Sequence, residues 1–186
     1  MQTRVSANKT QPGRETPPSG GRNNNYDTGG KGACDPKILG KYFSGRDLNI
    51  AICVCDHESG GNLLTVNDKG LRPATEDINN ADYSIGPMQY NLWTCGRCDA
   101  AWETCLIPGK QPPLNVGAKI KNFEALQACA ANVGVKIERV PGIPLTQKGG
   151  TRATAIDFDS YTRNTIVPLR NGAGGWGNWS TYKYCR

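Results

Sequence analysis

The sequence DLNIAICVCDHESGG, residues 47–61, is a nearly continuous apolar run that ends in a glutamate, a serine and two glycines. Asp47 is a favourable N-cap, and the residues after it are apolar on almost every side, as in a helix buried in a small domain. Gly60 and Gly61 end the run, because glycine adopts the left-handed conformation at a helix C-terminus at little cost. The sequence therefore predicts a buried helix over residues 47–59.

Glu58 falls in the last turn of this predicted helix. The carbonyl end of the helix dipole repels a negative charge, and apolar surroundings remove water from it. Both effects raise the pKa of a carboxyl group, so Glu58 is a candidate general acid near neutral pH. The alternative is a solvated glutamate at a helix end, and the motifs that follow favour the acid.

Four motifs occur in an order typical of one enzyme superfamily. HESGGN at 57–62 and YSIGPMQYN at 83–91 closely resemble the lysozyme-like superfamily, in particular lytic transglycosylases (SLT) and goose-type lysozymes. PPLNVGA at 112–118 approximates a later motif, and WSTYK at 179–183 loosely resembles the closing one. Pro87 departs from the commoner leucine. The resemblance covers roughly residues 48–186. It implies an α+β, mainly helical, disulfide-stabilised lysozyme-like fold with a small antiparallel sheet beside a sugar cleft.

The resemblance also implies roles for the matching residues. Glu58 would protonate the departing glycosidic oxygen, and Tyr182 would hydrogen-bond near it. Ser59 lies beside the acid, although its hydroxyl is also suited to capping the helix end. The residues expected to contact the sugars are Ser59, Met88, Gln89, Tyr90, Asn91 and Tyr182.

A second carboxylate usually assists glycoside hydrolysis from the opposite face of the ring. Asp82 is the first choice, because it adjoins the strand leading into the turn at 86–89. The alternative resembles the lytic transglycosylases, in which one glutamate acts as acid and then base and a 1,6-anhydro ring replaces hydrolysis. Asn80 stands near a position that is acidic in goose-type lysozymes, which slightly favours the transglycosylase. The acidic residues considered are Asp68, Glu76, Asp77 and Asp82.

The chain contains eight cysteines, an even number in a loop-rich sequence. This favours up to four disulfides in a secreted, periplasmic or cell-wall-associated protein, with about 105 possible pairings. The alternative is zinc, because Cys95 and Cys98 have ligand spacing and Cys105 or His57 could complete the set. His57 is otherwise expected to be structural. The disulfide candidates are Cys34, Cys53, Cys55, Cys95, Cys98, Cys105, Cys129 and Cys185.

The length of 186 residues suits one domain, with residues 1–33 as a flexible basic, Gly- and Pro-rich tail and 34–186 as the catalytic domain. The net charge of +6 suits an anionic cell wall. We expect peptidoglycan glycan strands as the partner, a monomer and no cofactor. Nucleic acid is not expected, because the basic residues are scattered. No run is long enough for a membrane span, and the N-terminus lacks a signal-peptide core.

The remaining elements are predicted from local patterns. Apolar residues at helical spacing predict an amphipathic helix over 115–132, and short alternating pieces predict strands at 63–66 and 83–85. A short helix is expected around 99–105. Residues 135–175 resemble the family least and are expected to form loops with a helix at 153–165.

The leading hypothesis is a muramidase that cleaves the β-1,4 bond between N-acetylmuramic acid and N-acetylglucosamine. Three alternatives remain open: a non-catalytic peptidoglycan- or chitin-binding module, a chitinase on the same fold, and a zinc-stabilised nucleic-acid binder.

Overall fold

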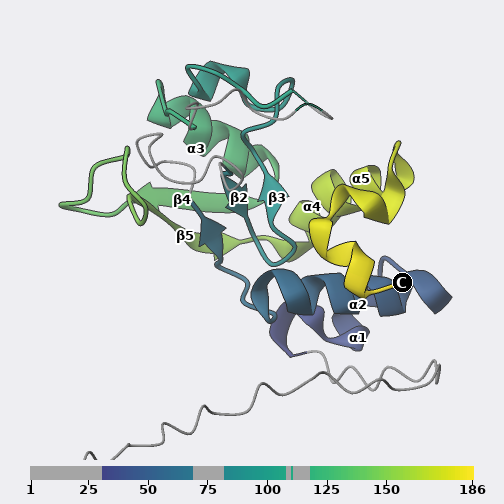
Figure 1. Cartoon of the computed structure of the whole chain (residues 1–186). Coiled ribbons are helices and arrows are strands. Elements are labelled where there is room, and N and C mark those ends of the chain that lie inside the picture. The colour runs from purple at the N-terminus through teal and green to yellow at the C-terminus, as the bar shows by residue number, and fades with distance from the viewer. Residues whose placement is uncertain (1–30, 69–81, 108–109, 111–117) are drawn as a thin grey trace, which may run out of the picture.

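The computed structural model describes residues 31–68, 82–107, 110 and 118–186. Helices α1 (Pro36–Leu39) and α2 (Gly45–Ser59) lie together at one end, and α3 (Phe123–Asn132) lies at the other, with two small antiparallel sheets between them (Figure 1). The predicted α+β class with a small antiparallel sheet is therefore confirmed. Within the described part of the chain, no helix combines the length and hydropathy needed to cross a bilayer.

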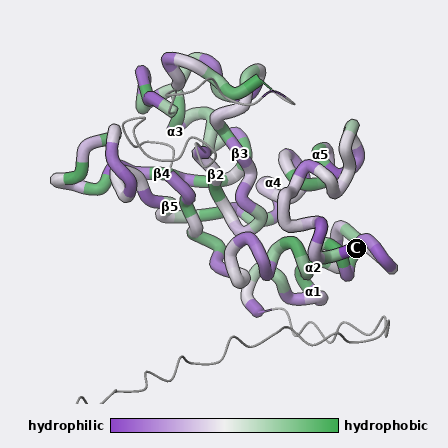
Figure 2. The backbone as a smooth tube through the Cα atoms, viewed as in Figure 1, coloured by the Kyte–Doolittle hydropathy of each residue, from purple (hydrophilic) through white to green (hydrophobic). Residues whose placement is uncertain are grey.

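Helix α2 lies in the lower half of the molecule, and it is hydrophobic in its middle and hydrophilic toward its ends (Figure 2). Its residues from Ile50 to Cys55 are buried. The helix ends where predicted, because Gly60 adopts a left-handed φ of 61° and donates its amide to Asp56. It begins earlier than predicted, at Gly45 with Ser44 as the N-cap.

Asp47 is therefore not the N-cap; it lies in the first turn of α2. Its carboxylate accepts a hydrogen bond from Trp176 Nε1 at 2.9 Å and forms an ion pair with Arg170. Both partners come from the C-terminal part of the chain, so the side chain fastens that segment to α2 instead of capping the helix.

The folded part begins before Cys34. Gly32–Cys34 form a 3-10 turn (η1), in which Ala33 is buried and donates its amide to Gly61. The last residues of the predicted tail thus pack against the end of α2, and residues 1–30 of that tail lie outside the described part of the chain.

The first sheet joins β1 (Val66–Asn67), β2 (Ser84–Ile85) and β3 (Tyr90–Asn91), with β2 in the middle. Ile85 faces Val66 on one side and Tyr90 on the other. The strand predicted at 63–66 begins only at Val66, and Leu63 and Leu64 are exposed.

The region 135–175 differs most from the prediction. Val135–Arg139 (β4) and Thr151–Ile156 (β5) form an antiparallel hairpin. Buried Thr151 and Ala153 alternate with outward residues in β5, so its period is that of a strand. Helical structure begins only after Asp157, whose carboxylate caps it by accepting from the Ser160 amide. The helical run is α4 (Phe158–Tyr161), a π-helical turn (Thr162–Ile166) and α5 (Val167–Asn171).

Two predicted helices are shorter than expected. Helix α3 begins at Phe123, because the Asn122 side chain caps it by accepting from the Ala125 amide at 3.0 Å. Residues 111–117, with most of the motif at 112–118, lie outside the described part of the chain. The helix predicted at 99–105 is reduced to a 3-10 turn at Asp99–Ala101, because Trp102 is extended and forms a bridge with Ile120.

All eight cysteines form disulfides, which confirms the prediction and contradicts the zinc alternative. In the proposed zinc pair, Cys95 is bonded to Cys105 and Cys98 is bonded to Cys129. This framework is typical of proteins from oxidising, extracytoplasmic environments. The pairs are Cys34–Cys55, Cys53–Cys185, Cys95–Cys105 and Cys98–Cys129.

We predict that Asp47→Ala lowers the free energy of unfolding by about 1–3 kcal/mol, because it leaves the indole N–H of nearly buried Trp176 without its acceptor. Urea unfolding measures the change. Glu124→Ala, on the exposed side of α3, is the control and should change stability by less than about 0.5 kcal/mol. Equal stability of the two variants would contradict the assigned role of Asp47.

Candidate active site

Glu58 is half-buried at the end of α2, and its carboxyl group has a fixed partner. The hydroxyl of Thr181 donates a hydrogen bond to Glu58 Oε1 at 2.7 Å. Burial raises the pKa of Glu58, and this effect exceeds the lowering by the Thr181 hydrogen bond and by the charge of His57. The direction of the shift is the one that the sequence predicted, with burial as its largest cause.

Thr181 occupies the place expected for Tyr182. Both residues belong to the 3-10 turn η7 (Ser180–Tyr184). With about three residues per turn, adjacent side chains in such a helix point in different directions. Thr181 therefore meets Glu58, whereas Tyr182 packs against the hydrophobic core.

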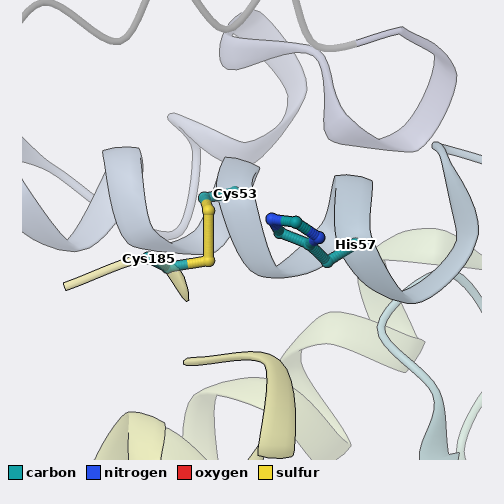
Figure 3. Close-up of side chains that lie close together, drawn as sticks. All are labelled: Cys53, His57 and Cys185. Atoms are coloured by element: carbon teal, nitrogen blue, oxygen red, sulfur yellow. A yellow bond between two sulfur atoms is a disulfide. The ribbon is translucent and has the colours of Figure 1, made fainter. Parts of the chain in front are cut away.

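The Cys53–Cys185 disulfide fastens η7 to α2 and keeps Thr181 near Glu58. Figure 3 shows this bridge beside His57, which lies one turn after Cys53 on the same helix. Potential ligand atoms of Cys53, His57 and Cys185 lie within 4.8 Å of one another. Both sulfur atoms are consumed by the disulfide, however, so the cluster offers no thiolate to a metal.

Asp82, the preferred second carboxylate, lies just before β2 and is partly buried. Ser84 Oγ donates to its Oδ1 at 2.6 Å, and Asn67 Nδ2 donates to its Oδ2 at 3.4 Å. Burial raises the pKa of Asp82 to about 6; the Ser84 hydrogen bond opposes this rise, and the negative charge of Glu58 adds to it.

Asp68 serves a structural purpose. It is 4% exposed, and its Oδ2 accepts a hydrogen bond from the Gly149 amide at 2.6 Å, which ties the β4–β5 hairpin loop to the end of β1. The other acidic candidates, Glu76 and Asp77, lie outside the described residues, as does Asn80.

The turn between β2 and β3 has a constrained backbone. Gln89 has a positive φ of 50°, a conformation that is uncommon for residues other than glycine. Its side-chain Nε2 donates to the Gly86 carbonyl at 2.9 Å. Such backbone outliers cluster at functional sites, where the surrounding structure holds them in place.

Tyr161 holds this turn, a role that no local pattern in the sequence indicates. Its side chain is fully buried, and its hydroxyl donates to the Ile85 carbonyl at 3.1 Å. The backbones of Met88 and Tyr90 lie near the same hydroxyl and lower its pKa. Burial raises the pKa of Tyr161, and the charge of Glu58 adds to the rise. The phenol thus holds the backbone where the turn begins.

The close approach of Tyr161 to the turn requires a glycine at position 86. A Cβ atom at this position would lie 2.6 Å from the ring of Tyr161, closer than real side chains pack. The glycine of the motif therefore allows Tyr161 to reach the backbone of the turn.

The other predicted substrate contacts differ in their exposure and in their hydrogen-bond partners. Met88 is 0% exposed and its carbonyl accepts from Trp179 Nε1 at 2.8 Å, so Met88 is a core residue. The Ser59 hydroxyl accepts from the Gly61 amide at 3.2 Å and caps the helix end. Asn91 Oδ1 accepts from the Trp93 amide at 2.7 Å. Tyr90 and Gln89 stay partly exposed beside the turn.

A cavity of about 300 Å³ lies at a different place, where α3 ends and β4 and α4 begin. Polar side chains such as Asn132, Lys136, Asp157 and Asn164 line it. None of its lining residues belongs to the predicted site, so this cavity is separate from the Glu58 neighbourhood.

Comparison of the chain with protein-family models, with curated proteins and with solved structures found no match in any of the three. The candidate site is therefore characterised by its own features: a half-buried carboxyl group with a hydroxyl donor, a second buried carboxyl group whose pKa is raised, and a constrained turn held by a buried tyrosine.

We predict that Thr181→Val raises the pKa of Glu58, because it removes the hydrogen bond that lowers it. Carboxyl-carbon NMR titration measures the change directly. Thr181→Ser keeps the hydroxyl and should leave the pKa close to that of the parent protein. An unchanged Glu58 pKa in Thr181→Val would contradict the assigned hydrogen bond.

We also predict that Glu58→Gln lowers the pKa of Asp82 below its value of about 6, because the negative charge that raises it is removed. The same NMR titration, read at Asp82, tests this. Glu124→Gln, on the exposed side of α3, is the matched control and should leave Asp82 unaffected. If both variants titrate alike at Asp82, the two carboxyl groups do not interact.

Proposed function

We propose that the protein is a muramidase that cleaves the β-1,4 bond between N-acetylmuramic acid and N-acetylglucosamine in peptidoglycan. The observation that carries this proposal is the half-buried carboxyl group of Glu58, whose pKa is raised by burial and whose Oε1 is held by the Thr181 hydroxyl, together with a second buried carboxyl group, Asp82, whose pKa is also raised. The motifs that resemble the lysozyme-like superfamily add support, because Glu58 belongs to the one at 57–62 and Asp82 directly precedes the one at 83–91.

The chemistry needs an acid that keeps its proton until the glycosidic oxygen departs. We assign the role of general acid to Glu58 because of its place in the motif at 57–62 and at the half-buried end of α2, where burial raises the pKa of its carboxyl group. Ionised Asp82 then stabilises the positive charge that develops on the sugar or orients the attacking water.

The position of Asp82 favours hydrolysis with water over the single-glutamate route that ends in a 1,6-anhydro sugar. The hydrogen bonds from Ser84 and Asn67 hold the Asp82 carboxylate in one orientation, as a group that positions water requires. By contrast, Asn80 stands near a position that is acidic in goose-type lysozymes, and this difference favours a lytic transglycosylase. Analysis of the reaction products distinguishes the two routes.

The proposed setting is outside the cytoplasm. Four disulfides are stable in oxidising compartments, and the net charge of +6 attracts an anionic wall polymer. Chitin, an uncharged polymer of N-acetylglucosamine, is the competing substrate, and a binding module without catalysis is the competing function.

We predict that the protein clears suspensions of purified peptidoglycan and that Glu58→Gln slows clearing at least about 100-fold, because the general acid is lost. Glu124→Gln is the control and should retain parental activity. If Glu58→Gln remains fully active, Glu58 is not the acid; if the parent clears neither peptidoglycan nor chitin, the enzyme proposal fails.

Mass analysis of the released fragments belongs to the same experiment. Reducing ends, together with a strong loss of activity in Asp82→Asn, identify hydrolysis that uses both carboxyl groups. Anhydro ends with an active Asp82→Asn variant identify a transglycosylase that depends on Glu58 alone.

A further inference from the structure

We propose that Arg97 forms a carboxylate-binding subsite that recognises the acidic groups of peptidoglycan and thereby distinguishes it from chitin. This inference rests on the proposed function, because it assigns the substrate specificity of the same site.

The guanidinium group of Arg97 is held from two sides. Its central carbon lies 4.4 Å from the ring centroid of Tyr90, and its Nη1 donates to the Asn91 carbonyl. The backbone of Arg97 is also anchored, since it lies between Cys95 and Cys98, which form separate disulfides. An arginine fixed in this way loses little conformational freedom when a ligand binds.

The same guanidinium group keeps unused donors. It carries five N–H bonds. Within the described part of the chain, the backbone carbonyl of Asn91 is the only group that accepts a hydrogen bond from it. None of the carboxylates described there forms an ion pair with it. By contrast, Arg152, Arg163 and Arg170 each pair with an acidic residue. Arg97 is partly exposed and therefore presents a positive, hydrogen-bonding edge to solvent.

Tyr90 connects this group to the candidate active site. Its ring carries Arg97, while its backbone directly follows Gln89 of the constrained turn and pairs with Ile85 across the sheet. Arg97 thus flanks the constrained turn on the side of β3, and a glycan strand bound along the turn passes beside it.

The chemistry of the ligand follows from the donor set. A guanidinium edge matches a carboxylate, with two parallel N–H···O bonds. Peptidoglycan carries carboxylates, either on the lactyl ether of N-acetylmuramic acid or on the stem peptide attached to it. Chitin carries none, so an arginine beside the sugar-binding turn discriminates between the two polymers.

Binding to the Glu58→Gln protein, which does not turn over substrate, tests the subsite by calorimetry. The probes are a tetrasaccharide of alternating N-acetylglucosamine and N-acetylmuramic acid with free lactyl carboxylates, its amidated form, its form with stem peptides, and a chitin tetrasaccharide. Adding Arg97→Gln should weaken binding of a carboxylate-bearing probe about tenfold or more. Binding of the amidated and chitin probes should not change.

Arg139→Gln is the matched control, since Arg139 also lies over an aromatic ring, at 5.0 Å from the Phe123 centroid, but outside the candidate site. Thermal unfolding of each variant separates loss of recognition from loss of fold. An effect on the free lactyl probe alone identifies the lactyl group as the ligand, and an effect on the stem-peptide probe alone identifies the peptide.

Equal binding by Arg97→Gln and its parent, or equal weakening for all four probes, would overturn the subsite. If the wild-type protein still clears peptidoglycan in that case, the proposed function stands and only the role of Arg97 fails. If the protein clears no peptidoglycan and binds none of the probes, both proposals fail.

Discussion

The contact between the C-terminal segment and α2 is the constraint on which the candidate site depends. Trp176 binds Asp47 near the start of the helix, Cys185 is bonded to Cys53 in its middle, and Thr181 donates to Glu58 at its end. These attachments join segments more than 120 residues apart in the sequence. Because the segment covers the end of α2, it contributes to the burial that raises the pKa of Glu58.

A second constraint acts on the turn that carries Gln89. A left-handed backbone at a residue other than glycine costs on the order of 1–3 kcal/mol and persists only where its surroundings hold it. Here the Tyr161 hydroxyl donates to the Ile85 carbonyl just before the turn, and Trp179 Nε1 donates to the carbonyl of Met88 within it. The same C-terminal half of the chain thus shapes both the turn and the environment of Glu58, which couples the two parts of the site.

Local patterns predicted much of the fold but not its non-local contacts. The end of α2 at Gly60, the α+β class and the disulfide framework follow from glycine chemistry, residue period and cysteine number. The helix expected at 153–165 was wrong in its first part, because the short alternation of β5 becomes visible only when β4 pairs with it. Asp47 was assigned to a cap because a sequence does not show that Trp176 and Arg170 compete for its carboxylate.

Local chemistry is enough to place Glu58 in the last turn of a buried helix, since an apolar run followed by two glycines leaves the chain few alternatives. Which groups meet that carboxyl group depends on how distant segments pack. Thr181 rather than Tyr182 donates to it, and Asp82 rather than Asp68 responds to its charge. Those partners are distant in sequence, and their approach depends on chain packing and on the Cys53–Cys185 bridge, which no local pattern encodes.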